Sequence, residues 1–235
     1  METSYRNIHF LVIGVLFTTL AGFFFTYFIL FPKFEGISIT KHLHGLSLFA
    51  WYAMLIAQPI LIKKGKLQAH RSLGKLSYVL MPLIVLGILA VGGGGYHANL
   101  AKGMSAAEAI GGLALSVPGA ITLAIFYALA IWNRKNPALH MRYMICTLIP
   151  MLGPGLGRAV IIFGRLPFPV GVAVADYAAM ALAVVLIIYD WRKGKNFTPY
   201  VVALFLTLLA HIIFLNQMGA VWQAVGGAYA NLFLN

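Results

Sequence analysis

Apolar residues fill the chain in seven long runs, and short polar or glycine- and proline-containing stretches separate these runs. A helix that crosses the hydrocarbon core of a bilayer needs about 20 mostly apolar residues, at a rise of about 1.5 Å each. The pattern therefore predicts an all-α, multi-pass membrane protein, built as a seven-helix bundle. The predicted spans cover residues 8–31, 42–62, 72–91, 107–132, 138–163, 169–189 and 199–217.

Two of the run boundaries carry residues that are typical of helix starts. Ser105 is followed three residues later by Glu108, which is the capping-box pattern. Asn136 comes directly before Pro137, and proline is favoured at the first position of a helix. These signals support helices that begin near residues 106 and 137.

Glycine and proline predict interruptions at two other places. Four consecutive glycines, Gly92 to Gly95, follow the third run and are expected to end its helix. The segment 150–158 holds two prolines and three glycines, so we expect it to kink or break the fifth span beside Arg158. Broken helices at membrane depth are tolerated where they line an enclosed site.

The composition agrees with a membrane protein. Hydrophobic residues make up 61% of the 235 residues and charged ones only 9%, whereas a soluble domain has about a quarter charged residues. We expect one membrane domain over residues 1–217 and an apolar tail over 218–235. The tail is expected to be either an interfacial helix or an extension of the seventh span. The single cysteine, Cys146, excludes a disulfide framework and a cysteine-based zinc site.

The net charge of +12 does not indicate nucleic-acid binding, because the basic residues lie in short turns between apolar runs. Such turns orient membrane proteins, and the side richer in Lys and Arg faces the cytoplasm. Twelve of the 17 Lys and Arg residues fall on the side that carries the amino terminus, and five on the other. We therefore expect a cytoplasmic amino terminus, an external carboxy terminus and a bacterial inner-membrane location.

Four polar residues are predicted to share one level near the outer face. Counting from the span ends places His44, Arg158, Asp176 and His211 at similar depth. A charge inside a bilayer is costly and needs a partner or a function. We expect Arg158 and Asp176 to form an ion pair, either structural or part of a substrate or proton site. His211 is expected to be either a ligand or a core histidine that bonds a neighbour.

A second level is predicted at the cytoplasmic side. His70 opens the third span and His140 the fifth, and each is closely followed by an arginine, Arg71 or Arg142. Two histidines that face each other from two helices provide what a six-coordinate haem iron needs. The arginines would then bind the propionates. The alternative is that these residues are cationic anchors that bind lipid phosphate.

The chain resembles an uncharacterised family of bacterial seven-span membrane proteins over most of its length. The matching residues are Trp51, Gln58, Arg158 and Asp176, together with HLHG at 42–45, HRSLG at 70–74, HMRYM at 140–144 and YD at 189–190. That resemblance implies no particular activity. A looser likeness is to transmembrane b-type cytochromes that carry two haems, held by spans two and four and by spans three and five. The fourth span here has no histidine, which departs from that pattern.

Three functions remain open from the sequence. The first is haem b, or a related redox metal, bound by His70 with His140 and by His44 with His211, for electron transfer with a quinone or a membrane redox partner. The second is a non-haem zinc, iron or copper centre in a membrane enzyme or a metal-handling protein. Its ligands would be His42, His44, His211 and Asp176. The third is a non-catalytic subunit, or a small-ligand transporter or receptor-like bundle.

Overall fold

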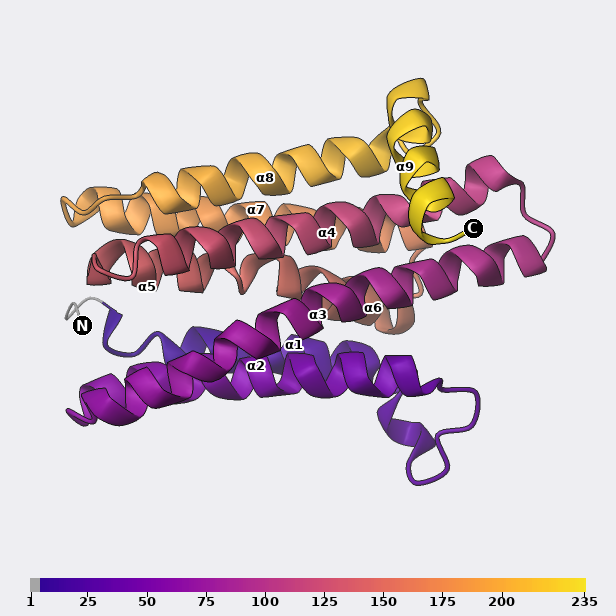
Figure 1. Ribbon diagram of the computed structural model, residues 1–235. Helices are drawn as coiled ribbons and strands as arrows, with labels where there is room; N and C mark the ends of the chain where they lie inside the picture. The colour runs from indigo at the N-terminus through magenta and orange to yellow at the C-terminus, as the bar shows by residue number, and fades with distance from the viewer. Residues whose placement is uncertain (1–4) are drawn as a thin grey trace.

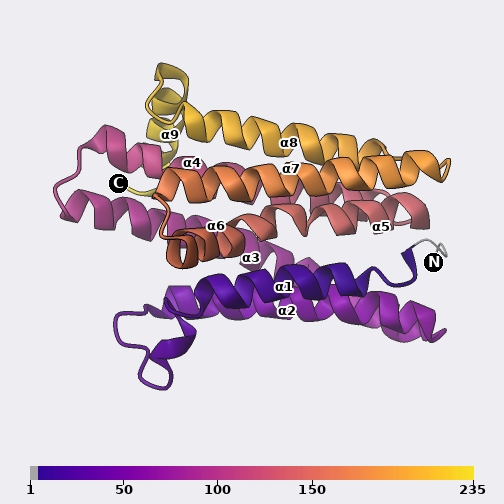
Figure 2. The ribbon, with the colours of Figure 1, turned by 180° about the vertical axis from the view of Figure 1, so that it is seen from behind.

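The computed structural model of the protein describes residues 5–235. The described chain is helical without strands, and most of its helices run side by side (Figures 1 and 2). In chain order the elements are α1 (His9–Phe23), the short 3₁₀ helix η2 (Phe28–Leu30), α2 (Ile39–Lys63), α3 (Leu67–Ala101), α4 (Ala106–Trp132), α5 (Pro137–Cys146), α6 (Ile149–Gly164), α7 (Phe168–Arg192), α8 (Thr198–Leu215) and α9 (Ala220–Phe233).

Six stretches of helix among the described residues are long and apolar enough to cross a membrane. They are α2, α3, α4, α5 taken together with α6, α7 and α8. They correspond to the last six of the seven predicted spans. The first predicted span holds α1, which has only 15 residues, whereas a crossing needs about 20. The all-helical prediction is thus confirmed with six helices that could cross a membrane, which is consistent with a multi-pass membrane protein. A seventh crossing and the orientation stay predictions.

The expected helix starts are present. The Ser105 side chain accepts a hydrogen bond from the Glu108 backbone, and the Glu108 carboxylate accepts one from the Ser105 backbone, which completes the predicted capping box. Asn136 caps α5 by accepting a hydrogen bond from the Leu139 N–H. Pro137 is the first residue of that helix. Local capping chemistry therefore fixes the ends of α4 and α5 as the sequence predicts.

The expectation that Gly92 to Gly95 end the third span is wrong. Helix α3 has 35 residues and continues through these glycines to Ala101. Gly92 lies against α4, where an added Cβ would come within 2.3 Å of Oγ of Ser116. Small residues at a contact let two membrane helices approach closely. At least at Gly92, the glycine therefore serves helix packing.

The break in the fifth span lies earlier than expected. Helix α5 ends at Cys146 and α6 begins at Ile149, and α6 then runs without interruption past Pro154 and Arg158. A proline has no N–H and clashes with the carbonyl four residues before it. For Pro150 that carbonyl belongs to Cys146, where α5 ends. The break is therefore at residues 147–148, away from Arg158.

The break changes the neighbours of the chain. Helix α5 packs on α4 and α8, whereas α6 packs chiefly on α1 and α7. The contact between α1 and α6 is very close, because a Cβ added to Gly22 would come within 2.0 Å of the carbonyl oxygen of Gly155. Only glycine permits such backbone contact. This contact places the second half of α6 beside α1.

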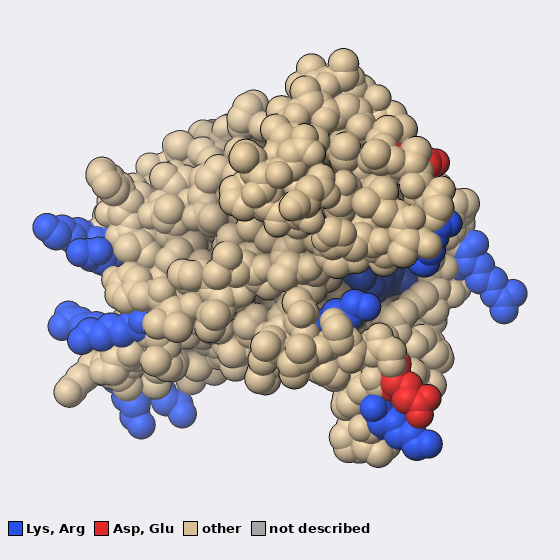
Figure 3. Space-filling model, turned by 45° about the vertical axis from the view of Figure 1, so that its right-hand side comes forward, with Lys and Arg blue, Asp and Glu red and all other residues tan. Residues whose placement is uncertain are grey.

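The loops divide between two ends of the bundle. We call the end with loops 64–66, 133–136 and 193–197 the basic end, and the other, with loops 24–38, 102–105, 165–167 and 216–219, the opposite end. On the face that Figure 3 shows, Lys and Arg side chains gather towards the two ends, and a wide belt between them has no charged side chains. Such a belt is what a bilayer core requires.

The tail forms its own helix. Helix α9 turns away from the direction of α8 and lies across the bundle near the opposite end (Figure 1). The Trp222 indole donates to the carbonyl of Ile110 at 3.0 Å, and the Gln223 amide donates to the carbonyl of Ala107 at 3.0 Å. Of the two alternatives for the tail, the structure has a separate helix held on α4, and no extension of α8.

Candidate functional site

His211 lies on the buried face of α8. Tyr200, Ala203 and Thr207 precede it at three- and four-residue spacing and are also buried, so this face points into the bundle. The Nδ1 atom of His211 lies 2.8 Å from Oδ2 of Asp176 on α7. Because a carboxylate oxygen accepts, Nδ1 carries the proton and donates it. The Nε2 atom is buried and has no hydrogen-bond partner among residues 5–235.

His44 has a second buried ring nitrogen without a partner. Its Nδ1 is enclosed and has no hydrogen-bond partner in the described chain. The ring lies against Gly87 of α3, where an added Cβ would come within 3.1 Å of Nδ1. At about 1.5 Å per residue, His44 and His211 both lie roughly 6–8 Å from the ends of their helices at the opposite end. The predicted common level of the two histidines therefore agrees with the helix bounds.

Helices α2 and α8 lie on opposite sides of the bundle in both ribbon views (Figures 1 and 2). His44 and His211 therefore come from two sides of the bundle. Polar atoms that are buried without a partner are rare in folded proteins and call for an explanation. In the described chain, three imidazoles have such an atom, those of His9, His44 and His211. Only His44 and His211 lie at one depth near the opposite end, and this pair is the strongest chemical signal of the structure.

Arg158 does not form the predicted ion pair with Asp176. Within residues 5–235, Asp176 pairs with His211, and the Arg158 guanidinium donates to the carbonyl of Pro154 at 3.2 Å. It also lies over the Phe23 ring, 4.3 Å from the centroid. Gly157 faces α7, since a Cβ there would lie 3.3 Å from the carbonyl oxygen of Gly171. One residue later the helix has turned by about 100°, so Arg158 points towards α1.

Arg158 lies near an imidazole. Its side chain is exposed although it lies well inside the length of α6, and it is close enough to His44 for the two to interact electrostatically. Arginine has only hydrogen-bond donors. This level thus offers a cation without an acidic partner among the described residues, next to an imidazole.

The predicted four-residue metal centre is not assembled. In the described chain, no group of three or more His, Cys, Asp or Glu side chains is arranged to hold a metal ion. His42 is engaged elsewhere, with Nδ1 at 2.6 Å from the Tyr27 hydroxyl and its ring against Phe34. As expected from its two-residue offset from His44, it points another way. Of the four proposed ligands, only His211 and Asp176 are in contact.

At the basic end, His70 and His140 do come near each other. They are close enough to interact electrostatically. His140 Nδ1 lies 2.8 Å from the carbonyl of Ala130 and donates to it. The Gln58 amide satisfies its partners when it donates to His70 Nδ1 and accepts from the Gly74 N–H. A neutral His70 then carries its proton on Nε2 and is a donor there, whereas Nε2 of a neutral His140 is an acceptor.

Arg142 does not face a cofactor site. Its side chain is 1% exposed and forms a bidentate ion pair with the fully buried Asp190. Nε lies 2.6 Å from Oδ2, and Nη2 lies 3.2 Å from Oδ1. Tyr5 donates to the same carboxylate at 2.9 Å and accepts from Tyr200. The Arg142 guanidinium is therefore engaged with Asp190, and its predicted role as a propionate partner stays a prediction that these contacts do not support. Arg71, the other predicted partner, is exposed at the basic end.

Sequence reasoning singled out Arg142 and, within the YD motif, Asp190, but it did not pair them, and it missed Tyr5 and Tyr200. Burial raises the pKa of the Tyr5 phenol above its ordinary value, so the hydroxyl stays protonated and keeps donating to Asp190. Tyr5 precedes the first apolar run and carried no signal. Asp190 did carry one, because an acid at the end of a span that is followed by basic residues needs a cationic partner.

The chain was also compared with known proteins. No protein-family model, no curated protein and no solved structure matches it.

Proposed function

We propose that this protein binds haem b in the half of the bundle nearer the opposite end and transfers electrons within the membrane. His44 and His211 would be the two axial ligands. Haem iron needs only two ligands from the protein, so the absence of a three-residue metal group in the described chain does not count against it. The observation that carries the proposal is His211, whose Nδ1 is held by Asp176 and whose Nε2 is buried without a partner.

The donor set fits this cofactor in three respects. A carboxylate that holds one ring nitrogen fixes the tautomer and raises the basicity of the other nitrogen, as in metal-binding histidines. The second ring with a buried, partnerless atom, His44, lies at the same depth on the other side of the bundle. Arg158, which has no acidic partner in the described chain, would bind a propionate with charge-assisted hydrogen bonds.

The chain's own residues would hold and tune the group. The bound iron would supply a one-electron change between ferric and ferrous states. Asp176 would favour the ferric form by adding negative charge behind His211. His70 and His140 would be a second pair only if the Gln58 amide turned to accept a proton from His70 Nδ1. We therefore rank the pair His44 and His211 first. In this proposal the basic end faces the cytoplasm, and α1 forms a seventh crossing.

The test is an absorption spectrum of the full-length protein, purified from haem-supplied cells, in oxidised and dithionite-reduced forms. We expect a Soret band and reduced α-bands in the wild type. His211→Ala and His44→Ala should each lose most of this absorbance, whereas His97→Ala is the matched control because His97 is exposed on α3. Asp176→Asn should keep the bands and raise the reduction potential. A wild type without a Soret band and without iron would overturn the proposal.

A second function is favoured by Arg158 alone. A cation at membrane depth without an acidic partner among the described residues would bind a small carboxylate or phosphate for transport or sensing. In a haem-free protein, such anions should raise the melting temperature of the wild type but not of Arg158→Gln. No shift with any anion would exclude this function.

A further inference from the structure

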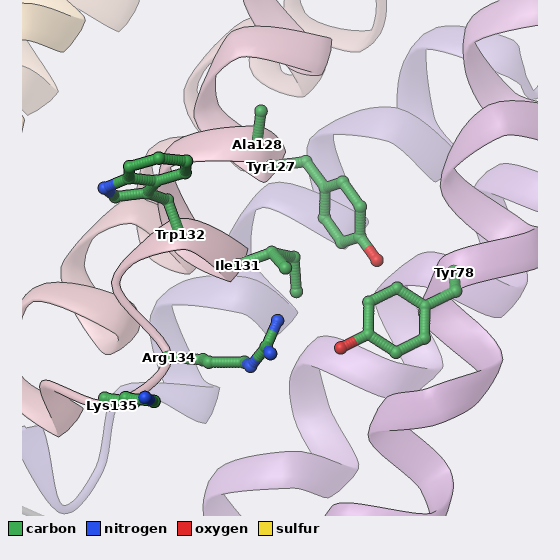
Figure 4. A pocket seen from close by; sticks show the side chains of 7 residues that line it. All are labelled: Tyr78, Tyr127, Ala128, Ile131, Trp132, Arg134 and Lys135. Atoms are coloured by element: carbon green, nitrogen blue, oxygen red, sulfur yellow. The ribbon is translucent and has the colours of Figure 1, made fainter.

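A cavity of about 660 Å³ that opens widely to the surface lies between α3 and α4 at the basic end, outside the sites described above. Its lining includes Tyr78 on α3, Tyr127 and Ile131 on α4, and Arg134 and Lys135 directly after α4 (Figure 4). Its volume is within the range of small-molecule sites, about 300–1,000 Å³. Sequence reasoning did not find it, because its walls come from two helices and its rim from a loop.

The polar groups of this cavity are mostly hydrogen-bond donors. The side chains of Arg134 and Lys135, and the Tyr78 hydroxyl, make no hydrogen bond or ion pair with any described residue. In Figure 4 the Tyr78 hydroxyl and the Arg134 guanidinium turn towards each other across the cavity. Two cations and a hydroxyl donor around one space select an anion, and a guanidinium matches phosphate oxygens in pairs.

The inner wall is fixed in place. Ser77 donates to the carbonyl of Gly74 at 2.6 Å, so its oxygen is left to accept from the Tyr127 hydroxyl at 2.8 Å. Tyr127 also packs edge-on against Trp51, with ring centroids 5.9 Å apart. Its ring is therefore a rigid apolar wall, and its hydroxyl hydrogen is not available to a ligand. Ile131 and Ala128 add further apolar surface.

The location of the cavity indicates where its ligand comes from. Trp132 is 87% exposed at the end of α4, and exposed tryptophans are enriched at the membrane–water interface. Tyr127 is five residues before this end, or about 8 Å deeper. The basic rim is thus at headgroup level, and the aromatic wall is at the level of the acyl chains.

We propose that this cavity binds a phosphate-bearing ligand, and specifically the headgroup of an anionic phospholipid. The lipid phosphate would lie between Arg134, Lys135 and the Tyr78 hydroxyl, with an acyl chain along Tyr127 and Ile131. Basic pockets between transmembrane helices are suited to anionic headgroups in this way. The proposal is independent of haem binding, because it uses neither histidines nor Arg158.

The test uses full-length protein in nanodiscs of phosphatidylcholine with a small fraction of phosphatidylglycerol, and native mass spectrometry counts the lipids retained. We expect the wild type to retain phosphatidylglycerol in preference to phosphatidylcholine. Arg134→Gln with Lys135→Gln should lower retention about tenfold or more. Lys193→Gln with Lys195→Gln is the matched control at the same end, and it should retain lipid like the wild type.

Tyr78→Phe keeps the shape of the wall and should lower retention several-fold, so it also tests the site if the double variant fails to fold. Equal retention by the wild type and the Arg134/Lys135 variant, or equal retention of both lipids by the wild type, would overturn the proposal. An excess of inorganic phosphate separates the two sources. If it displaces phosphatidylglycerol completely, and labelled phosphate binds the wild type alone, the site is a phosphate-ion site and the lipid assignment is wrong.

Discussion

The ion pair of Arg142 and Asp190 offers the sharpest test of the fold. Asp190→Ala would remove a carboxylate that is fully buried and accepts from Arg142 and from Tyr5. Removing one partner of a buried pair costs about 3–5 kcal/mol, because the remaining charge stays away from water. For a chain of this size about 2–4 °C of melting temperature corresponds to 1 kcal/mol. We therefore expect a decrease of about 6–20 °C.

Thermal unfolding of purified protein in detergent, followed by tryptophan fluorescence, measures this decrease. The matched control is Glu35→Ala, which removes an ion pair that is 3.9 Å long and 80% exposed at both partners. Exposed pairs contribute little, so its melting temperature should equal that of the wild type. Tyr5→Phe removes one hydrogen bond to Asp190, and its melting temperature should lie between those of Asp190→Ala and Glu35→Ala. If Asp190→Ala and Glu35→Ala have the same melting temperature, the Arg142–Asp190 network does not stabilise the bundle and our reasoning fails.

Two further predictions concern packing and orientation. Gly155→Leu should force α1 away from α6 and lower the melting temperature by several degrees, because overpacking costs about 1–3 kcal/mol. Gly14→Leu is the control, because its added side chain meets open space, and it should not lower the melting temperature. Equal melting temperatures of both variants would refute the close contact. For orientation, an impermeant maleimide should label Lys33→Cys in intact spheroplasts and Lys64→Cys only after permeabilisation, and the reverse pattern would show that the basic end faces outwards.

Depth along the membrane could be predicted from the sequence, because it follows from counting residues along a span. His44, Arg158, Asp176 and His211 were placed at one level, and the helix bounds agree for His44 and His211. Partners at that level could not be predicted. They depend on the rotation of each helix about its own axis, which neighbouring helices decide. Asp176 was assigned to Arg158, but the structure pairs it with His211.

Small residues were interpreted wrongly for a related reason. Glycine ends helices in water because it favours flexible backbone, yet in a membrane bundle it also lets two helices touch. Gly92 lets α3 and α4 touch, because it lies against Ser116. A sequence pattern alone does not distinguish these roles, because the partner helix is far away in the chain.

The break after Cys146 links this packing to the proposed chemistry. Pro150 ends α5 while it packs on α4 and α8, and the chain restarts as α6 beside α1 and α7. In an unbroken helix, Arg158 would continue along α4 and α8, on the side of His211. A guanidinium there would compete with His211 for Asp176, since it offers the carboxylate two parallel hydrogen bonds. With the break, Arg158 reaches Phe23 and His44 instead. Asp176 is thereby left to hold Nδ1 of His211, and this bond is what makes Nε2 an electron-pair donor inside the bundle.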